Sequence, residues 1–246
     1  MHGSQVNPLA GAPKENNDAE SGASARFNSL SQLPHLKGKK SREILTAMID
    51  VRLFGGISTK TKDAINLTGP VQFALLNPSL NAVDLRMHQN TSVFVSSTDK
   101  GRGAIGTTTV VPYALCQIHG WINPFAAINT DLTSTDVDAM FTALWESVNN
   151  ANTRSKSNQN SLLLLQVVYS GPTKKLYGLD RKIKLQPNEE KRHEQLRSSD
   201  DYELDFTDFE AATKDPKVKA VNFYTEDPAL KGQLVGLPKF SELKLG

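Results

Sequence analysis

The histidines, the single cysteine and a few acidic side chains are the residues of this sequence with the greatest potential for chemistry. The five histidines stand singly, without a second histidine or a cysteine at the spacing of a metal site. Cys116 and His119 lie three residues apart in a segment that reads as a strand, which would point them to opposite faces. We therefore expect no metal site, and we interpret Cys116 as a small buried hydrophobic residue.

Asp50 is the acidic residue considered for catalysis, because it lies within a basic segment. No partner for acid–base chemistry is visible beside it, and a salt bridge or a loop-anchoring hydrogen bond is the simpler interpretation. Gly101, Gly103 and Gly106 match the dinucleotide-binding string GxGxxG, but a strand rather than a helix is expected to follow. The sequence therefore predicts no catalytic residue and no cofactor, although these glycines would let backbone amides approach a phosphate.

Composition and charge limit the class of protein. The chain has 246 residues, enough for one sizeable core or two small ones. It shows neither a membrane-spanning apolar run nor a secretory signal, so we expect a cytoplasmic, reducing location. The net charge of +2 conceals two basic segments, residues 37–62 with seven basic and two acidic side chains and residues 151–197 with ten and four. These segments could form one electropositive face for a polyanion, or they could be ordinary solvated surface.

The elements that would position these residues are predicted from apolar spacing, caps and turns. Residues 1–36 are rich in Asn, Ser, Ala and Gly and read as a flexible N-terminal segment. A helix is predicted over 41–53, stopped by Gly55 and Gly56, and its lysine-rich start would tolerate a bound anion. Residues 76–107 read as an extended hairpin, with short alternations at 83–87 and 93–95.

The remaining elements complete an α+β fold with helices on one face of a mostly antiparallel sheet. The clearest is a helix that starts at Thr133 or Ser134 and carries a core-facing apolar stripe from Val137 to Val148. Residues 162–169 have the apolarity of a central strand that is buried on both faces. Strands are also predicted at 71–75, 107–122 (with an edge or bulge at Pro112), 182–185, 202–206 and 218–224, with a short helix at 207–213.

Three groups of motifs, in order, resemble a known family. They are residues 49–56 (IDVRLFGG), residues 69–73 (GPVQF), and residues 106–109 leading into 111–115 (VPYAL) and 119–124 (HGWINP). The sequence is similar to the repeated backbone subunits of type I CRISPR Cascade complexes, which are proteins of the RAMP superfamily, and most similar to the type I-B and I-C branches.

This resemblance implies a modified RNA-recognition (ferredoxin-like) palm with an inserted β-hairpin thumb. On this chain the palm would cover residues 37–246, with the thumb at about 74–107. Copies would assemble along the spacer of a CRISPR RNA, together with other Cascade subunits, and present the guide for pairing with target DNA. The thumb tip would displace a nucleotide at regular intervals, and contacts to the RNA backbone would suit guides of any sequence.

The candidate RNA contacts are basic, glycine and thumb residues of the matching segments. Lys39 and Lys40 could instead be free surface lysines, Arg52 could pair only with Asp50, and Met87 could pack within the hairpin. The basic segment 174–197 could also reach RNA or a neighbouring subunit. The full set is Lys39, Lys40, Arg42, Arg52, Gly55, Gly56, Gln72, Arg86, Met87, Lys100 and Arg102, with Asn77 as a weaker candidate.

One departure and two other hypotheses accompany the resemblance. Family members usually begin with a strand and an Asn-Pro-x-Gly-Asp-Pro loop, which residues 7–11 (NPLAG) match only faintly, so the first strand is absent or the sequence is incomplete or atypical there. A RAMP-like ribonuclease would use Asp50 or an N-terminal acidic residue to cleave RNA. A plain protein-interaction domain would show no salt-dependent affinity for RNA.

Overall fold

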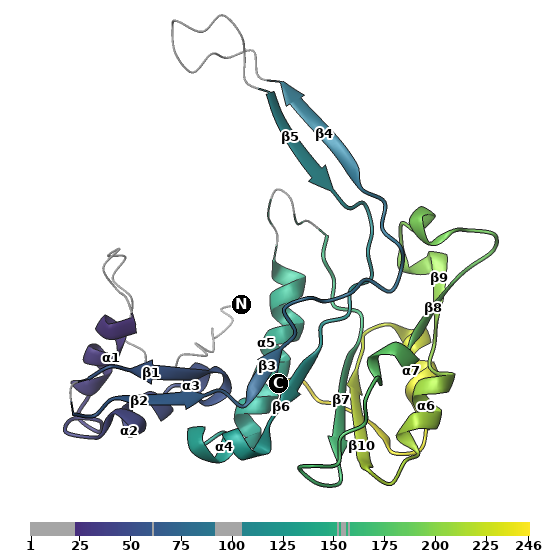
Figure 1. The fold of residues 1–246 in the computed structure, drawn as a ribbon. Helices are drawn as coiled ribbons and strands as arrows, with labels where there is room; N and C mark the ends of the chain where they lie inside the picture. The colour runs from purple at the N-terminus through teal and green to yellow at the C-terminus, as the bar shows by residue number, and fades with distance from the viewer. Residues whose placement is uncertain (1–22, 61, 92–104, 152, 154–155, 157) are drawn as a thin grey trace, which may run out of the picture.

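The computed structural model describes residues 23–60, 62–91, 105–151, 153, 156 and 158–246. Its N-terminal part packs three short helices against a two-stranded antiparallel sheet, with Leu30, Ile44 and Leu67 buried between them (Figure 1). The flexible segment predicted through residue 36 is wrong for residues 23–36, because Leu30 and Leu36 anchor this stretch in the core. The elements are α1 (Ala23–Ser31), α2 (Ser41–Thr46), α3 (Ile49–Phe54), β1 (Gly55–Ser58) and β2 (Ile65–Thr68).

The single helix predicted over 41–53 is two helices. Met48 is extended, with φ −97° and ψ 127°, and its side chain is buried. Arg52 donates from Nη1 to the carbonyl oxygen of Thr46 at 2.9 Å, so a carbonyl at the end of α2 is satisfied by a side chain. The prediction failed because this break depends on the position of Arg52, which a residue far along the chain determines. Gly55 does end the second helix, as predicted.

The central part joins two short strands to the longest helix. β3 (Val71–Phe73) pairs antiparallel with β6 (Gly120–Ile122), and α4 (Pro124–Thr130) leads into α5 (Ser134–Asn150). The predicted cap is confirmed, because Thr133 and Asp136 form a reciprocal capping box. Met140 and Trp145 are buried, whereas the rest of the predicted stripe is half-buried. This helix covers β3 and holds Leu53 and Val71 in a small core.

The predicted extended hairpin is present and projects from the body of the molecule (Figure 1). It consists of β4 (Arg86–Thr91) and β5 (Ile105–Val110), which pair only with each other among the described residues. The strand predicted at 93–95 lies outside the described residues. The predicted strand 107–122 is a continuous strand only at its two ends, within β5 and β6. Between them Cys116 forms an isolated antiparallel bridge with Ser79, and it is exposed. The interpretation of Cys116 as a buried residue is therefore wrong.

The C-terminal part builds the largest core. β10 lies between β11, to which it is parallel, and β7, to which it is antiparallel. The predicted central strand is thus an edge strand of this sheet and is half-buried along its length, because its partner on one side is absent among the described residues. The elements are β7 (Leu164–Tyr169), β8 (Lys184–Pro187), β9 (Tyr202–Asp205), α6 (Thr207–Thr213), β10 (Val218–Tyr224), α7 (Pro228–Leu234), β11 (Phe240–Glu242) and the 3-10 helices η1 (Asp180–Lys182), η2 (His193–Gln195) and η3 (Ser199–Asp201).

The architecture is a mixed α+β fold, as predicted, and five of the six strand pairings among the described residues are antiparallel. The expectation of helices on one face of one sheet is wrong, because the described strands form several sheets of two or three strands. None of the described helices has the length and apolarity needed to cross a membrane.

Candidate nucleic-acid interface

The basic residues at the start of α2 are partly neutralised by carboxylates. Lys39 pairs with Glu43 at 3.0 Å, and Arg42 pairs with Asp131 at 2.7 Å. Lys40 is exposed and forms no ion pair with a described carboxylate. The anion expected at this helix start is supplied by the chain itself, because the backbone N–H of Ser41 donates to Asp63 at 2.6 Å and lowers the pKa of that carboxyl. Lys40 is therefore the cation of this group with the most freedom to meet an external phosphate.

Arg52 is committed to a partner that the sequence did not reveal. Its Nε and Nη2 donate to the two carboxylate oxygens of Asp136 at 2.8 and 2.6 Å. The Asp136 side chain is 5% exposed, and these hydrogen bonds lower its pKa despite burial. The alternative that Arg52 pairs with Asp50 is wrong, because Asp50 accepts from Arg26 at 2.6 and 2.9 Å. The only sequence signal for Asp136 was its place in the capping box.

Gly55 and Gly56 have a visible structural reason to be glycine. Gly55 has φ +83°, and a Cβ there would lie 2.2 Å from the carbonyl oxygen of Leu67 and 2.5 Å from the nitrogen of Gly69. A Cβ on Gly56 would lie 3.3 Å from the side chain of Val51. These glycines let α3 turn directly into β1 beside β2, and their predicted contact with an RNA backbone stays a prediction.

The hairpin base combines charge with exposed apolar surface. Met87 is 70% exposed, so it does not pack within the hairpin. Arg86 donates to Asp84 at 2.8 Å, and Arg197 donates to the same carboxylate at 3.2 Å. The second basic segment of the sequence therefore reaches the base of the hairpin. Lys100 and Arg102 lie outside the described residues.

An exposed aromatic residue of β6 lies beside a lysine and a tyrosine from the segment that follows β7. Gln72 lies opposite Trp121 in the strand pair, and its amide donates to the carbonyl oxygen of Gly69 at 3.0 Å. The ammonium of Lys175 lies 4.7 Å from the ring centre of Trp121 and 5.9 Å from that of Tyr177. We call Trp121, Lys175 and Tyr177 the aromatic–lysine cluster. Sequence reasoning missed it as a unit, because its members come from two distant segments.

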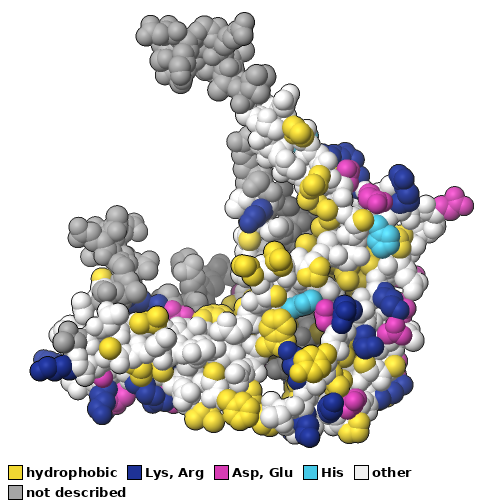
Figure 2. Space-filling model, in the orientation of Figure 1, with side chains coloured by type: hydrophobic (Ala, Val, Ile, Leu, Met, Phe, Trp, Pro, Cys, Tyr) yellow, Lys and Arg dark blue, Asp and Glu magenta, His cyan; other side chains and the backbone are white. Residues whose placement is uncertain are grey.

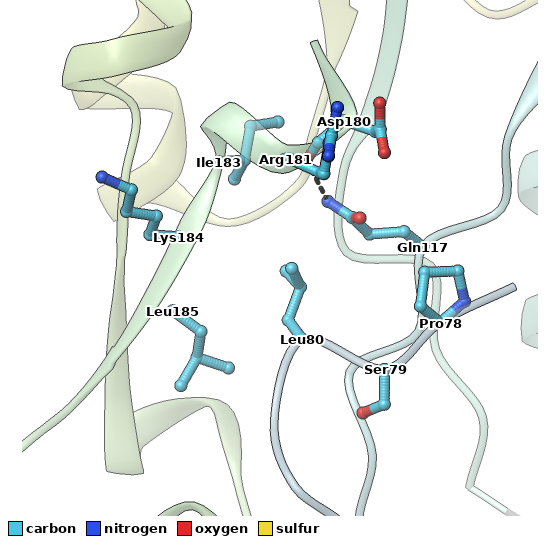
Figure 3. Close-up of a pocket in the computed structure, with 9 residues that line it drawn as sticks. All are labelled: Pro78, Ser79, Leu80, Gln117, Asp180, Arg181, Ile183, Lys184 and Leu185. Carbon is cyan, nitrogen blue, oxygen red and sulfur yellow. Dashed lines mark hydrogen bonds between the residues drawn. The ribbon is translucent and has the colours of Figure 1, made fainter. Parts of the chain in front are cut away.

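A cavity of about 450 Å³ joins the loop before the hairpin to the chain between β7 and β8 (Figure 3). Gln117 lines one side of it and donates to the backbone carbonyl of Asp180 at 3.2 Å. Apolar side chains, including Leu80 and Ile183, share the lining with the charged Arg181 and Lys184. The cavity thus connects the hairpin base to the second basic segment.

Comparisons with known proteins give the class of protein to which this fold and these basic surfaces belong. A family model described as CRISPR-associated protein Cas7 matches residues 11–207, which is most of the chain. The chain therefore belongs to the Cas7 family, and the resemblance seen in the motifs is confirmed.

The individual proteins that the chain matches are longer than the chain. It is 29% identical over 191 residues to "CRISPR-associated protein Cas7" of Haloferax volcanii, which covers 70% of this chain and 55% of the relative. The chain thus spans about half the length of the curated relative that it matches. A chain in a solved structure titled "CRISPR RNA-guided surveillance complex, pre-nicking" aligns with a TM-score of 0.46 and 13% identity, covering 82% of this chain and 54% of that one.

Proposed function

We propose that this chain is a non-catalytic, RNA-binding backbone subunit of a CRISPR surveillance complex. In this function it binds the spacer of a guide RNA, assembles side by side with further copies and with other subunits, and presents the guide to target DNA. The observation that carries the proposal is the Cas7 family match over residues 11–207.

The projecting hairpin supports this proposal, and we propose that it is the thumb of the motif-based prediction. Leu85 directly precedes β4 and is 66% exposed, and Met87, within β4, is 70% exposed. A two-stranded ribbon is marginal alone, and its exposed apolar side chains favour contact with a ligand or a neighbour. We infer that the hairpin contacts guide RNA and that its apolar side chains separate neighbouring bases.

The candidate contacts differ in how free they are to bind phosphate. Lys40 has no described carboxylate partner, and Arg86 shares Asp84 with Arg197. Lys39, Arg42 and Arg52 each have an ion-pair partner of their own. We therefore propose Lys40 and Arg86 as direct contacts and Arg52 as a positioning residue. Contacts of this kind bind any sequence, as a protein that holds varied guides requires.

The ribonuclease hypothesis has less support. Both carboxylate oxygens of Asp50 accept hydrogen bonds from Arg26, so a metal ion or a reacting water would have to compete with this guanidinium. Asp50 has the geometry of the structural salt bridge that was the simpler interpretation. We propose that it anchors α1 to α3 and does not cleave RNA.

The test is an RNA-binding titration of the full chain across a series of salt concentrations. We expect equal affinity for two single-stranded RNAs of unrelated sequence, and a decrease in affinity as salt rises. Lys40→Ala and Arg86→Ala should each make the slope of log K against log salt shallower by about 0.7, whereas the exposed Lys219→Ala is the matched control. Absence of affinity at low salt would contradict the proposal. Cleavage of a complementary RNA in the presence of a divalent metal would favour the ribonuclease instead.

A further inference from the structure

Both aromatic rings of the aromatic–lysine cluster are exposed. Tyr177 is 86% exposed and Trp121 is 45% exposed. The other tryptophan, Trp145, is 6% exposed and packs edge-on against Tyr224, with 4.8 Å between ring centres. An aromatic ring usually contributes to stability through burial, so two exposed rings that share one ammonium point to a role outside the core.

The cluster is held in place by the backbone around it. Trp121 lies within β6, which pairs with β3. Gly178 follows Tyr177 with φ +72°, and a Cβ there would lie 2.9 Å from Nη2 of Arg181, so the guanidinium packs over this turn. Gln117, four residues before Trp121, bonds to the carbonyl of Asp180 at 3.2 Å. This hydrogen bond ties together, at a second point, the two segments that carry the rings.

The charge around the rings is positive. Residues 174–182 contain four basic residues and one acidic residue, Asp180, and none of the basic residues forms an ion pair with a described carboxylate. Figure 2 shows hydrophobic and basic side chains next to each other in the central part of the face that it displays. Exposed rings next to unpaired cations match the two parts of a nucleotide, because a base stacks on a ring and a phosphate attracts a cation. The basic residues are Lys174, Lys175, Arg181 and Lys182.

We propose that the aromatic–lysine cluster is a stacking site for a base of single-stranded nucleic acid. The base stacks on Trp121 and Tyr177, while Lys175 and Arg181 neutralise the adjacent phosphates. This inference rests on the proposed function and adds to it a site away from the hairpin. Stacking tolerates any base, so the site suits a protein that must hold varied sequences. The strand could be the guide RNA or a DNA strand, since both offer the same base and phosphate chemistry.

Tryptophan fluorescence of the full chain tests the proposal directly. Trp145 is buried and Trp121 is exposed, so quenching by an added oligonucleotide reports on Trp121. We expect oligouridylate and oligothymidylate to quench the wild type, and Trp121→Ala to abolish the quenching. By anisotropy, Trp121→Ala and Tyr177→Ala should each weaken binding about fivefold or more, which is the lower end of one stacked base. Phe125→Ala, at another exposed aromatic residue, is the matched control and should change affinity by less than about twofold.

The outcomes separate this site from the proposed function. If the wild type binds both oligonucleotides and Trp121→Ala binds as well as Phe125→Ala, the stacking site is wrong while RNA binding stands. If the wild type binds neither, both proposals fail. If Trp121→Ala and Tyr177→Ala change only the association of the chain with itself, the surface is a protein interface and the stacking site is wrong.

Fluorescence of an assembled particle that already holds guide RNA distinguishes the two strands that the site could bind, the guide RNA and a DNA strand. Emission from Trp121 that is quenched before DNA is added supports a guide-binding site, whereas emission that is quenched only after single-stranded DNA is added supports a DNA-binding site. Emission that responds to neither strand overturns the proposal. Unchanged emission of Trp145 in Trp121→Ala is the control that the variant is folded.

Discussion

Removal of one partner of the ion pair between Arg52 and Asp136 should strongly destabilise the fold, because it leaves the other charge without its partner. Asp136→Ala removes two hydrogen bonds of 2.8 and 2.6 Å from a carboxylate that is 5% exposed. It also removes the capping-box contact in which Asp136 accepts from the N–H of Thr133 at 3.0 Å. Breaking a fully buried pair costs about 3–5 kcal/mol, and losing a cap costs about 1 kcal/mol.

The cost of leaving Arg52 without Asp136 is smaller than for a fully buried charge. The Arg52 side chain is 22% exposed and keeps its hydrogen bond to the carbonyl oxygen of Thr46. We therefore expect Asp136→Ala to lower the free energy of unfolding by about 3 kcal/mol, measured by urea denaturation. For a chain of this length, that corresponds to a fall in Tm of about 6–12 °C. Arg52→Ala should lose a comparable free energy and should leave the salt dependence of RNA binding unchanged.

A matched control is Asp208→Ala, which breaks a pair with Lys184 in which both side chains are more than half exposed. Asp208→Ala should lower the free energy of unfolding by less than about 1 kcal/mol. The hydrogen bonds from Arg52 lower the pKa of Asp136. The ionised Asp136 therefore stabilises the folded state fully above the ordinary carboxyl pKa, and this contribution is lost as the pH falls through the lowered pKa. The difference between wild type and Asp136→Ala should shrink accordingly in acid. Equal losses for Asp136→Ala and Asp208→Ala at neutral pH would refute this reasoning.

Three further predictions concern other parts of the chain. Gly55→Ala should destabilise the protein more than Gly38→Ala in urea, because both glycines have positive φ but only a Cβ at position 55 meets backbone atoms; equal losses would contradict this. The pKa of Asp201, lowered to about 2 by Lys191 and the N–H of Arg197, should be measurable by NMR and should rise in Lys191→Ala. The contribution of ionised Asp201 to the stability of the fold is present above about pH 4 and lost as the pH falls toward 2. An ordinary carboxyl pKa for Asp201 would contradict its ion pair with Lys191. Cys116 should react with a thiol reagent without denaturant, and protection would contradict its exposure.

The elements with local signals could be predicted from the sequence. Helix α5 carries its own cap and apolar stripe, and α6 and β10 have the predicted bounds. The break at Met48 could not be predicted, because it depends on Arg52 being held by Asp136. The edge position of β7 could not be predicted either, because apolarity shows that a strand is partly covered but not which strands lie beside it.

The candidate site was predictable by residue type and not by arrangement. The sequence identified Lys39, Arg42 and Arg52 as cations, but their neutralisation depends on Glu43 and on two carboxylates far along the chain. These two distant carboxylates are Asp131, which pairs with Arg42, and Asp136, which pairs with Arg52.

Distance along the chain also hid the aromatic–lysine cluster. Trp121 appeared in a recognised motif and Lys175 in a basic segment, but the sequence held no signal that these two segments meet. Tyr177 became visible only through its ring contact with Lys175.

Co-expression of this chain with a CRISPR array, followed by size-exclusion chromatography and extraction of bound nucleic acid, tests the proposed function most directly. We predict a large particle that contains several copies of the chain and RNA of one defined length. A monomer that elutes without RNA, and that ignores RNA at low salt, would contradict the proposal that this Cas7-family chain is the RNA-binding backbone of a surveillance complex.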